Sequence, residues 1–161
     1  MSEPAWLTIA RGHLGVREVP GKDTAPAIRR WLATLKAWWS DDETPWCGTF
    51  VAACLKQTGY EPPRHWYRAK AYADWGTPLQ KPEKGCVVVY DRKGGGHVGF
   101  VTAVDQSGRL LTLGGNQGNA VTIAPFDPSR VLAYRWPPGA PPPHGTLPLV
   151  ASQVKSSNNE A

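Results

Sequence analysis

The sequence has few cysteines, and their number and spacing are not those of a set of paired disulfides. The three cysteines are Cys47, Cys54 and Cys86, an odd number with no Cys-x-x-Cys pair. A disulfide framework uses an even number of cysteines, and a tetrahedral zinc site takes four closely spaced ligands. The sequence therefore predicts neither kind of site, and we expect Cys54 and Cys86 to be thiols of the core.

A long apolar run is also lacking. Residues 1–7 begin acidic and hold no stretch of the length that a signal peptide or a membrane span requires. We therefore expect synthesis in the cytoplasm without a signal peptide, and no membrane insertion.

Signatures of nucleic-acid binding are absent as well. The net charge of +5 suits an anionic partner. The 18 Lys and Arg residues are scattered rather than striped, and there is no helix-turn-helix, zinc-finger or RNA-binding motif. These features favour a bacterial wall, with its teichoic acids and peptide carboxylates, over nucleic acid.

The length of 161 residues, without internal repeats, is that of one domain, which we expect to be a monomer. Residues 1–136 carry the predicted helices and strands. From residue 137 the chain is rich in Pro, Ser and Asn and poor in large apolar side chains. The segment 137–161 is therefore predicted to be a disordered tail.

What the sequence does contain is a cysteine at the expected start of a helix. Thr44 is a suitable N-cap and Pro45 suits the first helical position, which puts Cys47 at the third. Unpaired amides and the positive end of the helix dipole favour a thiolate there, so the pKa of Cys47 is expected to be lowered. The alternative is a small buried residue, because Cys47 would share a helical face with Phe50 and Cys54.

A glycine-rich turn at 94–96 leads into a predicted strand over 97–104 that begins with a histidine. Alternation places His97, Gly99 and Val101 on one face, and the small residue beside the imidazole leaves room for a reacting group. His97 is thus a candidate general base, although a histidine at the start of a strand is more often structural.

The next predicted strand ends in an amide-rich run, GGNQGN, at 114–119. An antiparallel neighbour brings this run back beside His97, which completes a set of nucleophile, base and orienting amide. Asn116 and Gln117 lie on opposite faces if the strand extends that far, so only one of them faces His97. We choose Asn116 and keep Gln117 and Asn119 as alternatives.

The order and spacing of these blocks resemble those of the cysteine, histidine-dependent amidohydrolase/peptidase (CHAP) and NlpC-type peptidoglycan hydrolases, particularly a short form seen in phage endolysin-like proteins. The resemblance covers most of the chain. The matching blocks are GHLGVREVPG at 12–21, TPWC at 44–47, DWG at 74–76, GHVGFV at 96–101, LGGNQGN at 113–119 and YRW at 134–136.

The resemblance implies a papain-like α+β fold, with N-terminal helices packed on an antiparallel sheet and the nucleophile at a helix N-terminus. It implies that Cys47 attacks a carbonyl carbon, that His97 acts as general base and then general acid, and that Asn116 orients the imidazole. This mechanism needs no cofactor and no metal ion.

The surroundings of the cysteine supply candidates for substrate binding. Trp46 and Trp75 are expected to wall the cleft, with Gln117 nearby, although a tryptophan more often belongs to the core. The chain departs from the NlpC-type pattern, because Trp46 stands where that pattern has Asp and Gly48 follows where it has Ser. This departure favours the CHAP side of the resemblance.

The remaining pattern follows an α+β order. Helices are predicted over 2–14, from Thr24 to 35, from Pro45 to Gly59, and briefly over 68–75. The acids at 41–43 are expected to favour the positive helix end rather than to bind calcium. The predicted strands cover 86–90, 97–104, 109–113, 121–124 and 131–136.

The expected function is that of a peptidoglycan hydrolase, an amidase or endopeptidase that forms a thioester through Cys47, His97 and Asn116. We expect it to reach the cell wall through a phage holin or a secretion apparatus, with an immunity protein as a further partner. The alternatives are an acyl or peptidyl transferase of the same fold and an inactive wall-binding module. The sequence leaves open which bond is cut, the target organism, and the choice between phage lysis and a secreted effector.

Overall fold

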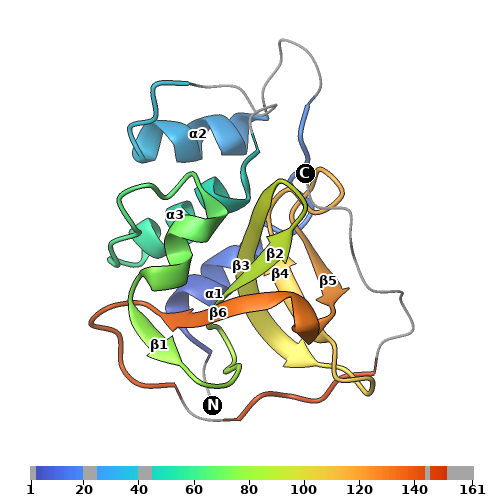
Figure 1. Cartoon of the computed structure of the whole chain (residues 1–161). Helices are drawn as coiled ribbons and strands as arrows, with labels where there is room; N and C mark the ends of the chain where they lie inside the picture. The colour runs from blue at the N-terminus through green and yellow to red at the C-terminus, as the bar shows by residue number, and fades with distance from the viewer. Residues whose placement is uncertain (1–2, 20–24, 40–44, 144–145, 152–161) are drawn as a thin grey trace.

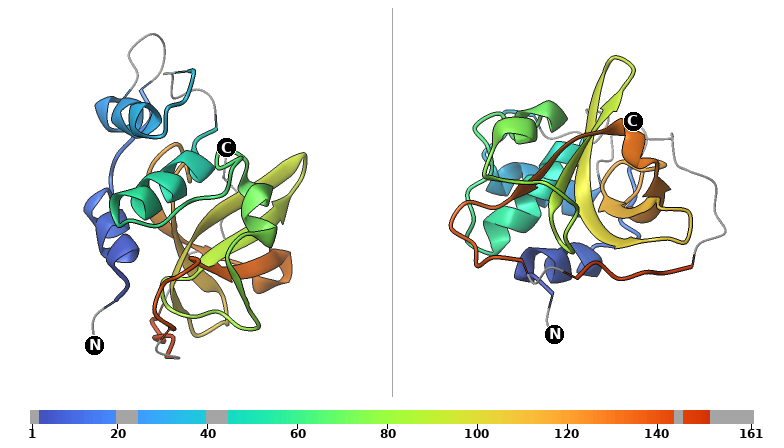
Figure 2. Two further views of the ribbon diagram at one scale, coloured as in Figure 1. Left: turned by 90° about the vertical axis from the view of Figure 1, so that its left-hand side faces the viewer. Right: turned by 60° about the horizontal axis from the view of Figure 1, so that its bottom comes forward.

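The structure is a computed structural model, which describes residues 3–19, 25–39, 45–143 and 146–151. Its helices lie together on one side of a twisted antiparallel sheet (Figure 1). The other views separate the same two layers (Figure 2). This mixed helical and antiparallel arrangement confirms the predicted α+β class.

The helices are α1 (Ala5–Gly12), α2 (Pro26–Thr34), α3 (Cys47–Gln57) and the 3-10 helix η1 (Ala69–Asp74). Each predicted helix is present, and each is shorter than predicted. In the described part of the chain, no helix has the length and apolarity needed to cross a membrane.

The sheet has the strand order β1-β6-β2-β3-β4-β5, and every pair of neighbours is antiparallel. The five predicted strands are present within two residues of their predicted limits, while β1 and the 3-10 helix η2 (Pro128–Arg130) were not predicted. The strands are β1 (Thr77–Leu79), β2 (Val87–Arg92), β3 (Gly95–Val104), β4 (Leu110–Gly114), β5 (Thr122–Phe126) and β6 (Val131–Trp136).

Helix α3 is the central element of the helical layer. All nine of its residues from Cys47 to Leu55 are buried, because α1 and α2 pack on it from one side and β3 from the other. Phe50 meets Phe100 of β3 with ring centroids 6.3 Å apart. The first turn of α3 is thereby fixed against the middle of the sheet.

The described part of the predicted tail is hydrogen-bonded to the domain. Trp136 Nε1 donates to the carbonyl oxygen of Pro141, and Val104 exchanges backbone hydrogen bonds with Pro148 and Val150. Leu149 thus forms a parallel bridge with Val104 at the end of β3. The disordered tail stays a prediction for residues 152–161, which lie outside the described residues.

Candidate active site

Cys47 is the first residue of α3, not the third helical residue that the sequence predicted. The N-cap is Trp46, whose side chain makes no capping hydrogen bond, and the predicted cap Thr44 lies outside the described residues. Trp46 is held in place instead by its indole Nε1, which donates to Glu18 Oε1 over 3.0 Å. The Trp46 ring lies against Gly115, where an added Cβ would come within 2.8 Å of it. The residue before the thiol is therefore fixed from two sides.

The Cys47 thiol is buried, with 5% of the residue exposed. Burial raises the pKa of this thiol above its ordinary value, and the backbone amides of Val98 and Gly48 together with the charge of Arg92 offset part of this rise. The predicted lowering of the pKa is therefore wrong, because desolvation outweighs the helix terminus. At neutral pH the thiol holds its proton until a base takes it.

His97 lies on β3, fully buried, and Val98, which follows it directly, directs its amide at the Cys47 thiol. The imidazole is stacked on the Phe126 ring, with centroids 5.3 Å apart and the planes only 7° from parallel. Tyr90 continues this stack on Phe126 at 4.5 Å. The plane of the imidazole is thus set by aromatic packing, a contribution that the sequence analysis missed because Phe126 lies beyond the predicted end of its strand.

The edge of the imidazole is held by Gln117. His97 Nε2 and Gln117 Oε1 are 2.9 Å apart. The Gln117 amide nitrogen donates to the carbonyl oxygens of Thr112 and Thr122, at 3.2 and 2.9 Å, which assigns its nitrogen and leaves Oε1 as the acceptor. His97 must then donate from Nε2–H, so the neutral ring carries its lone pair on Nδ1.

This geometry favours Gln117, which the sequence analysis kept as an alternative to Asn116. The sequence analysis preferred Asn116 on strand alternation, but β4 ends at Gly114, and Asn116 adopts a left-handed φ of 61° in the turn that follows. Alternation therefore does not extend to these residues, and the turn brings Gln117 to the imidazole. Gly114 leaves the space for this contact, since an added Cβ there would collide with Gln117 Oε1 and lie 3.3 Å from His97 Nε2.

Comparison with known families gives a match over the segment that holds two of these residues. The family model of the CHAP domain matches residues 39–116, a segment that runs from just before α3 to the turn after β4 and includes Cys47 and His97. Over these residues the chain is similar to the CHAP domain. CHAP domains are generally cysteine- and histidine-dependent amidases or peptidases, which indicates a function of the peptidoglycan-hydrolase type. No curated protein and no solved structure matches the chain.

The two tryptophans expected to wall the cleft are packed inside the domain. Trp46 is 1% exposed and Trp75 is 9% exposed. The indole nitrogen of Trp75 donates to the carbonyl oxygen of Glu61, and its ring meets Tyr72. Neither ring is presented to solvent, so the structure gives no support to their role in substrate binding.

The described residues contain no group of three or more His, Cys, Asp or Glu side chains arranged to hold a metal ion. The acidic run at 41–43, for which the sequence weighed calcium against the helix end, lies outside the described residues.

The other two cysteines are fully buried, as expected. Burial raises the pKa of Cys86 to about 12, and it raises the pKa of Cys54 still further. No histidine is hydrogen-bonded to either of them in the described structure. Of the three thiols, Cys47 alone lies at a helix N-terminus and next to β3, the strand that carries His97.

Proposed function

We propose that this protein hydrolyses an amide bond of peptidoglycan, with Cys47 as nucleophile, His97 as general base and acid, and Gln117 as the orienting group. The observation that carries the proposal is the hydrogen bond of 2.9 Å between His97 Nε2 and Gln117 Oε1. It fixes the tautomer in which Nδ1 accepts a proton, on a ring whose strand runs past the thiol.

The reaction begins with a neutral pair, because burial raises the pKa of the thiol. The Cys47 proton moves to His97 Nδ1 as sulfur attacks the carbonyl carbon of the substrate amide. The imidazolium that forms is stabilised by Gln117 Oε1, which accepts from Nε2–H in both charge states. Amides at the start of α3, which point toward the thiol, are the first candidates to stabilise the oxyanion.

Collapse of the tetrahedral intermediate breaks the carbon–nitrogen bond. The leaving amine takes the proton from His97, and the acyl group stays on Cys47 as a thioester. A water molecule then gives one proton to His97 and attacks the thioester, which releases a carboxylate product and restores the thiol. No other co-reactant is needed for these steps.

The arrangement that we propose is papain-like, with a helix-borne thiol facing a strand-borne histidine. The protein acts on the cell wall, which it reaches through a holin lesion or a secretion apparatus. The net charge of +5 supports an anionic polymer as the substrate.

The test is mass spectrometry of the soluble fragments released from purified peptidoglycan by the wild type and by Cys47→Ala. We expect fragments from the wild type alone, and their masses name the bond that is cut. Fragments that appear only after an amine or alcohol acceptor is added would indicate a transferase instead. Binding of peptidoglycan without fragments from either protein would contradict the proposal and indicate a binding module.

A further inference from the structure

A row of aromatic side chains leads from the solvent to the catalytic helix. Trp38 meets Trp39 edge to face at 5.3 Å, and Trp39 stacks on Trp66 at 5.7 Å with an interplanar angle of 28°. Tyr67 closes the row, with centroids 5.7 Å from Trp39 and 5.5 Å from Trp66. We call these four residues the aromatic row.

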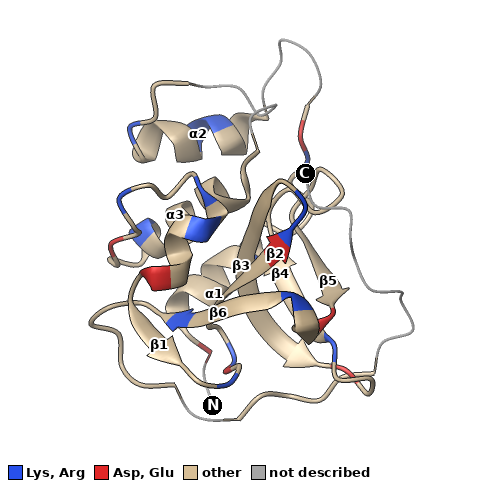
Figure 3. Ribbon diagram, viewed as in Figure 1, with Lys and Arg blue, Asp and Glu red and all other residues tan. Residues whose placement is uncertain are grey.

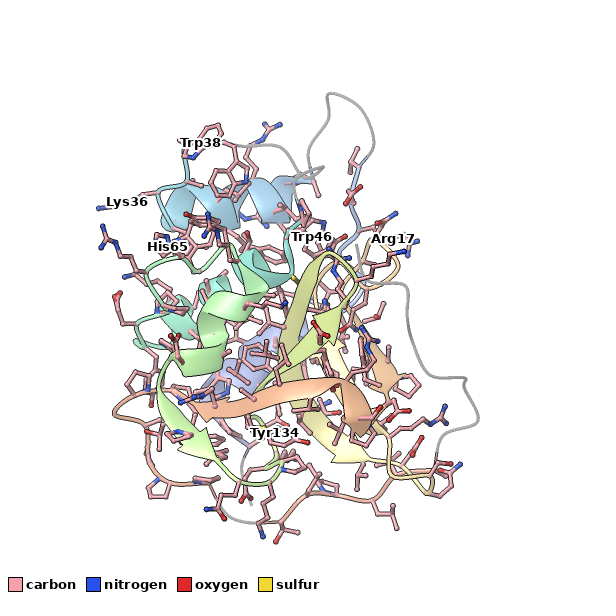
Figure 4. The ribbon with its side chains drawn as sticks, in the orientation of Figure 1. Arg17, Lys36, Trp38, Trp46, His65 and Tyr134 are labelled. Atoms are coloured by element: carbon pink, nitrogen blue, oxygen red, sulfur yellow. The ribbon has the colours of Figure 1, made fainter. Side chains whose placement is uncertain are left out.

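Two of the four side chains of this row are exposed to solvent. Trp38 is 91% exposed, and Tyr67 is 37% exposed. Leaving a tryptophan ring in water forgoes the large free energy that its burial would provide, so a ring held in this way commonly marks a binding surface. Figure 4 shows Trp38 with Lys36 and His65 at one corner of the molecule, beside α2.

The backbone of Trp66 and Tyr67 lies against Gly48, the residue that follows Cys47. A Cβ added to Gly48 would collide with the carbonyl oxygen of Trp66 and lie 3.2 Å from Tyr67. The segment that carries Trp66 therefore rests on the first turn of α3, directly after Cys47. Part of the aromatic row is therefore carried by a segment that is in contact with the residue after Cys47.

A groove with basic walls opens beside the row, between the end of α2 and the loop before η1. Glu61 contributes to the lining but is paired with Lys56, whose Nζ lies 2.6 Å from its carboxylate. Lys36 and Arg64 have no carboxylate partner among the residues that the structure describes. Lys and Arg residues are visible around α2 and α3 in Figure 3. The lining consists of Thr34, Leu35, Lys36, Lys56, Glu61, Pro62, Pro63, Arg64 and Trp66.

We propose that the aromatic row and this groove form a binding site for the peptidoglycan strand. The apolar faces of the sugar rings lie on Trp38 and Trp39, and carboxylates of the stem peptides pair with Lys36 and Arg64. This combination fits a polymer that carries apolar sugar faces and negative charges together. The inference rests on the proposed function and assigns its substrate contacts to residues other than Trp46 and Trp75.

The test uses co-sedimentation of Cys47→Ala protein with insoluble peptidoglycan, so that cleavage does not disturb binding. Trp38→Ala in this background is expected to weaken binding by at least tenfold, and Lys36→Glu or Arg64→Glu is expected to weaken it and to reduce its dependence on salt. Leu132→Ala, which removes another exposed apolar side chain, and Lys81→Glu, which makes the same charge change elsewhere, are the matched controls. They are expected to bind like the parent.

Equal binding by the Trp38 variant and the Leu132 control would overturn the aromatic site, and equal binding by both charge variants and the Lys81 control would overturn the basic groove. Activity assays separate the two proposals. If the wild type releases fragments and Trp38→Ala binds peptidoglycan as well as its parent, only the proposed binding site is contradicted. Binding that depends on Trp38 without any fragment release contradicts only the hydrolase.

Discussion

The proposed catalytic site and the aromatic row both adjoin the first turn of α3, and they differ in burial and in the kind of chain segment that carries them. Cys47, His97 and Gln117 are at most 5% exposed and come from regular elements or the turn directly after one. The aromatic row comes from irregular segments, and its outermost ring is 91% exposed.

This difference separates two tasks. Proton transfer needs fixed geometry and exclusion of water, which a buried helix terminus packed on a sheet supplies. Recognition of a polymer needs surface, and loops supply it because they lie outside the packed core. Gly48 is the point at which the two regions touch, because a larger residue there has no room.

The largest effect is expected from His97→Ala. Loss of the proton acceptor should reduce kcat by about 10³-fold, the middle of the range for general acid–base catalysis. The rate of the wild type should depend on pH through two macroscopic pKa values that belong to the Cys47–His97 pair. In the variant, the fall of the rate at acidic pH, which reports protonation of the imidazole, should be lost. The measurement is the pH profile of fragment release. Control of the wild-type rate by a single ionisation in the carboxylate range would count against the pair.

A smaller loss of kcat is expected from substitution of Gln117, and substitution of Asn116 serves as the comparison. Gln117→Ala removes the acceptor from His97 Nε2, and we expect a loss of about 10²-fold in kcat because the ring is no longer held in one orientation. Asn116→Gly is the matched control, since glycine tolerates the left-handed φ of 61°. It should lose less than tenfold.

Steady-state rates of the two variants decide between the residues. A greater loss for Asn116→Gly than for Gln117→Ala, with both proteins folded by circular dichroism, would restore Asn116 as the orienting group.

The contact between the two regions is tested by Gly48→Ala. The added methyl group collides with the carbonyl oxygen of Trp66, and we expect the free energy of unfolding to fall by about 1–3 kcal/mol, as in other overpacked sites. Gly12→Ala is the control on another helix, where nothing lies within 4 Å of the new Cβ. It should cause no loss, because alanine is favoured over glycine in helices by about 1 kcal/mol. Denaturant unfolding that finds equal stabilities for both variants would show that the contact is not tight.

The smallest effect concerns the buried thiols at alkaline pH. Burial raises the pKa of Cys86 to about 12, above the unfolded value of about 8.5. A thiol of this kind stabilises the fold fully below the unfolded pKa and loses that contribution as pH rises toward the folded one. Between these values each such thiol should lower the free energy of unfolding by about 1.4 kcal/mol per pH unit. Cys86→Ala should therefore reduce the slope of stability against pH, and an unchanged slope would contradict this account.

Much of the fold was predictable because its signals are local. The alternation after His97 and the apolar spacing around Ile28 predicted a strand and a helix that the structure contains. The strand β1 was not predicted, since three residues that include Pro78 carry no periodicity. The helix around Cys47 was predicted, but its first residue was not, because the capping rules favoured Thr44 and the chain is fixed instead by Trp46 and Glu18.

The site was predicted in part for the same reason. Cys47 and His97 stand in recognisable local contexts, whereas the choice between Asn116 and Gln117 depends on a left-handed turn that alternation does not describe. The pKa of Cys47 depends on how deeply the helix start is buried, which no local pattern gives. The adjacent pair Trp38 and Trp39 was a signal that went unused, since neighbouring large rings rarely point into the same core.

The covalent step is the centre of the account, and interception of the thioester with hydroxylamine tests it most directly. Peptidoglycan is digested by the wild type, Cys47→Ala and Cys54→Ala with and without hydroxylamine, and the new acyl ends are identified by mass spectrometry. The account predicts that wild type and Cys54→Ala convert part of the carboxylate ends into hydroxamates and that Cys47→Ala releases no fragments. Fragments from Cys47→Ala, or carboxylate ends alone from the wild type at high hydroxylamine concentration, would contradict a thioester at Cys47.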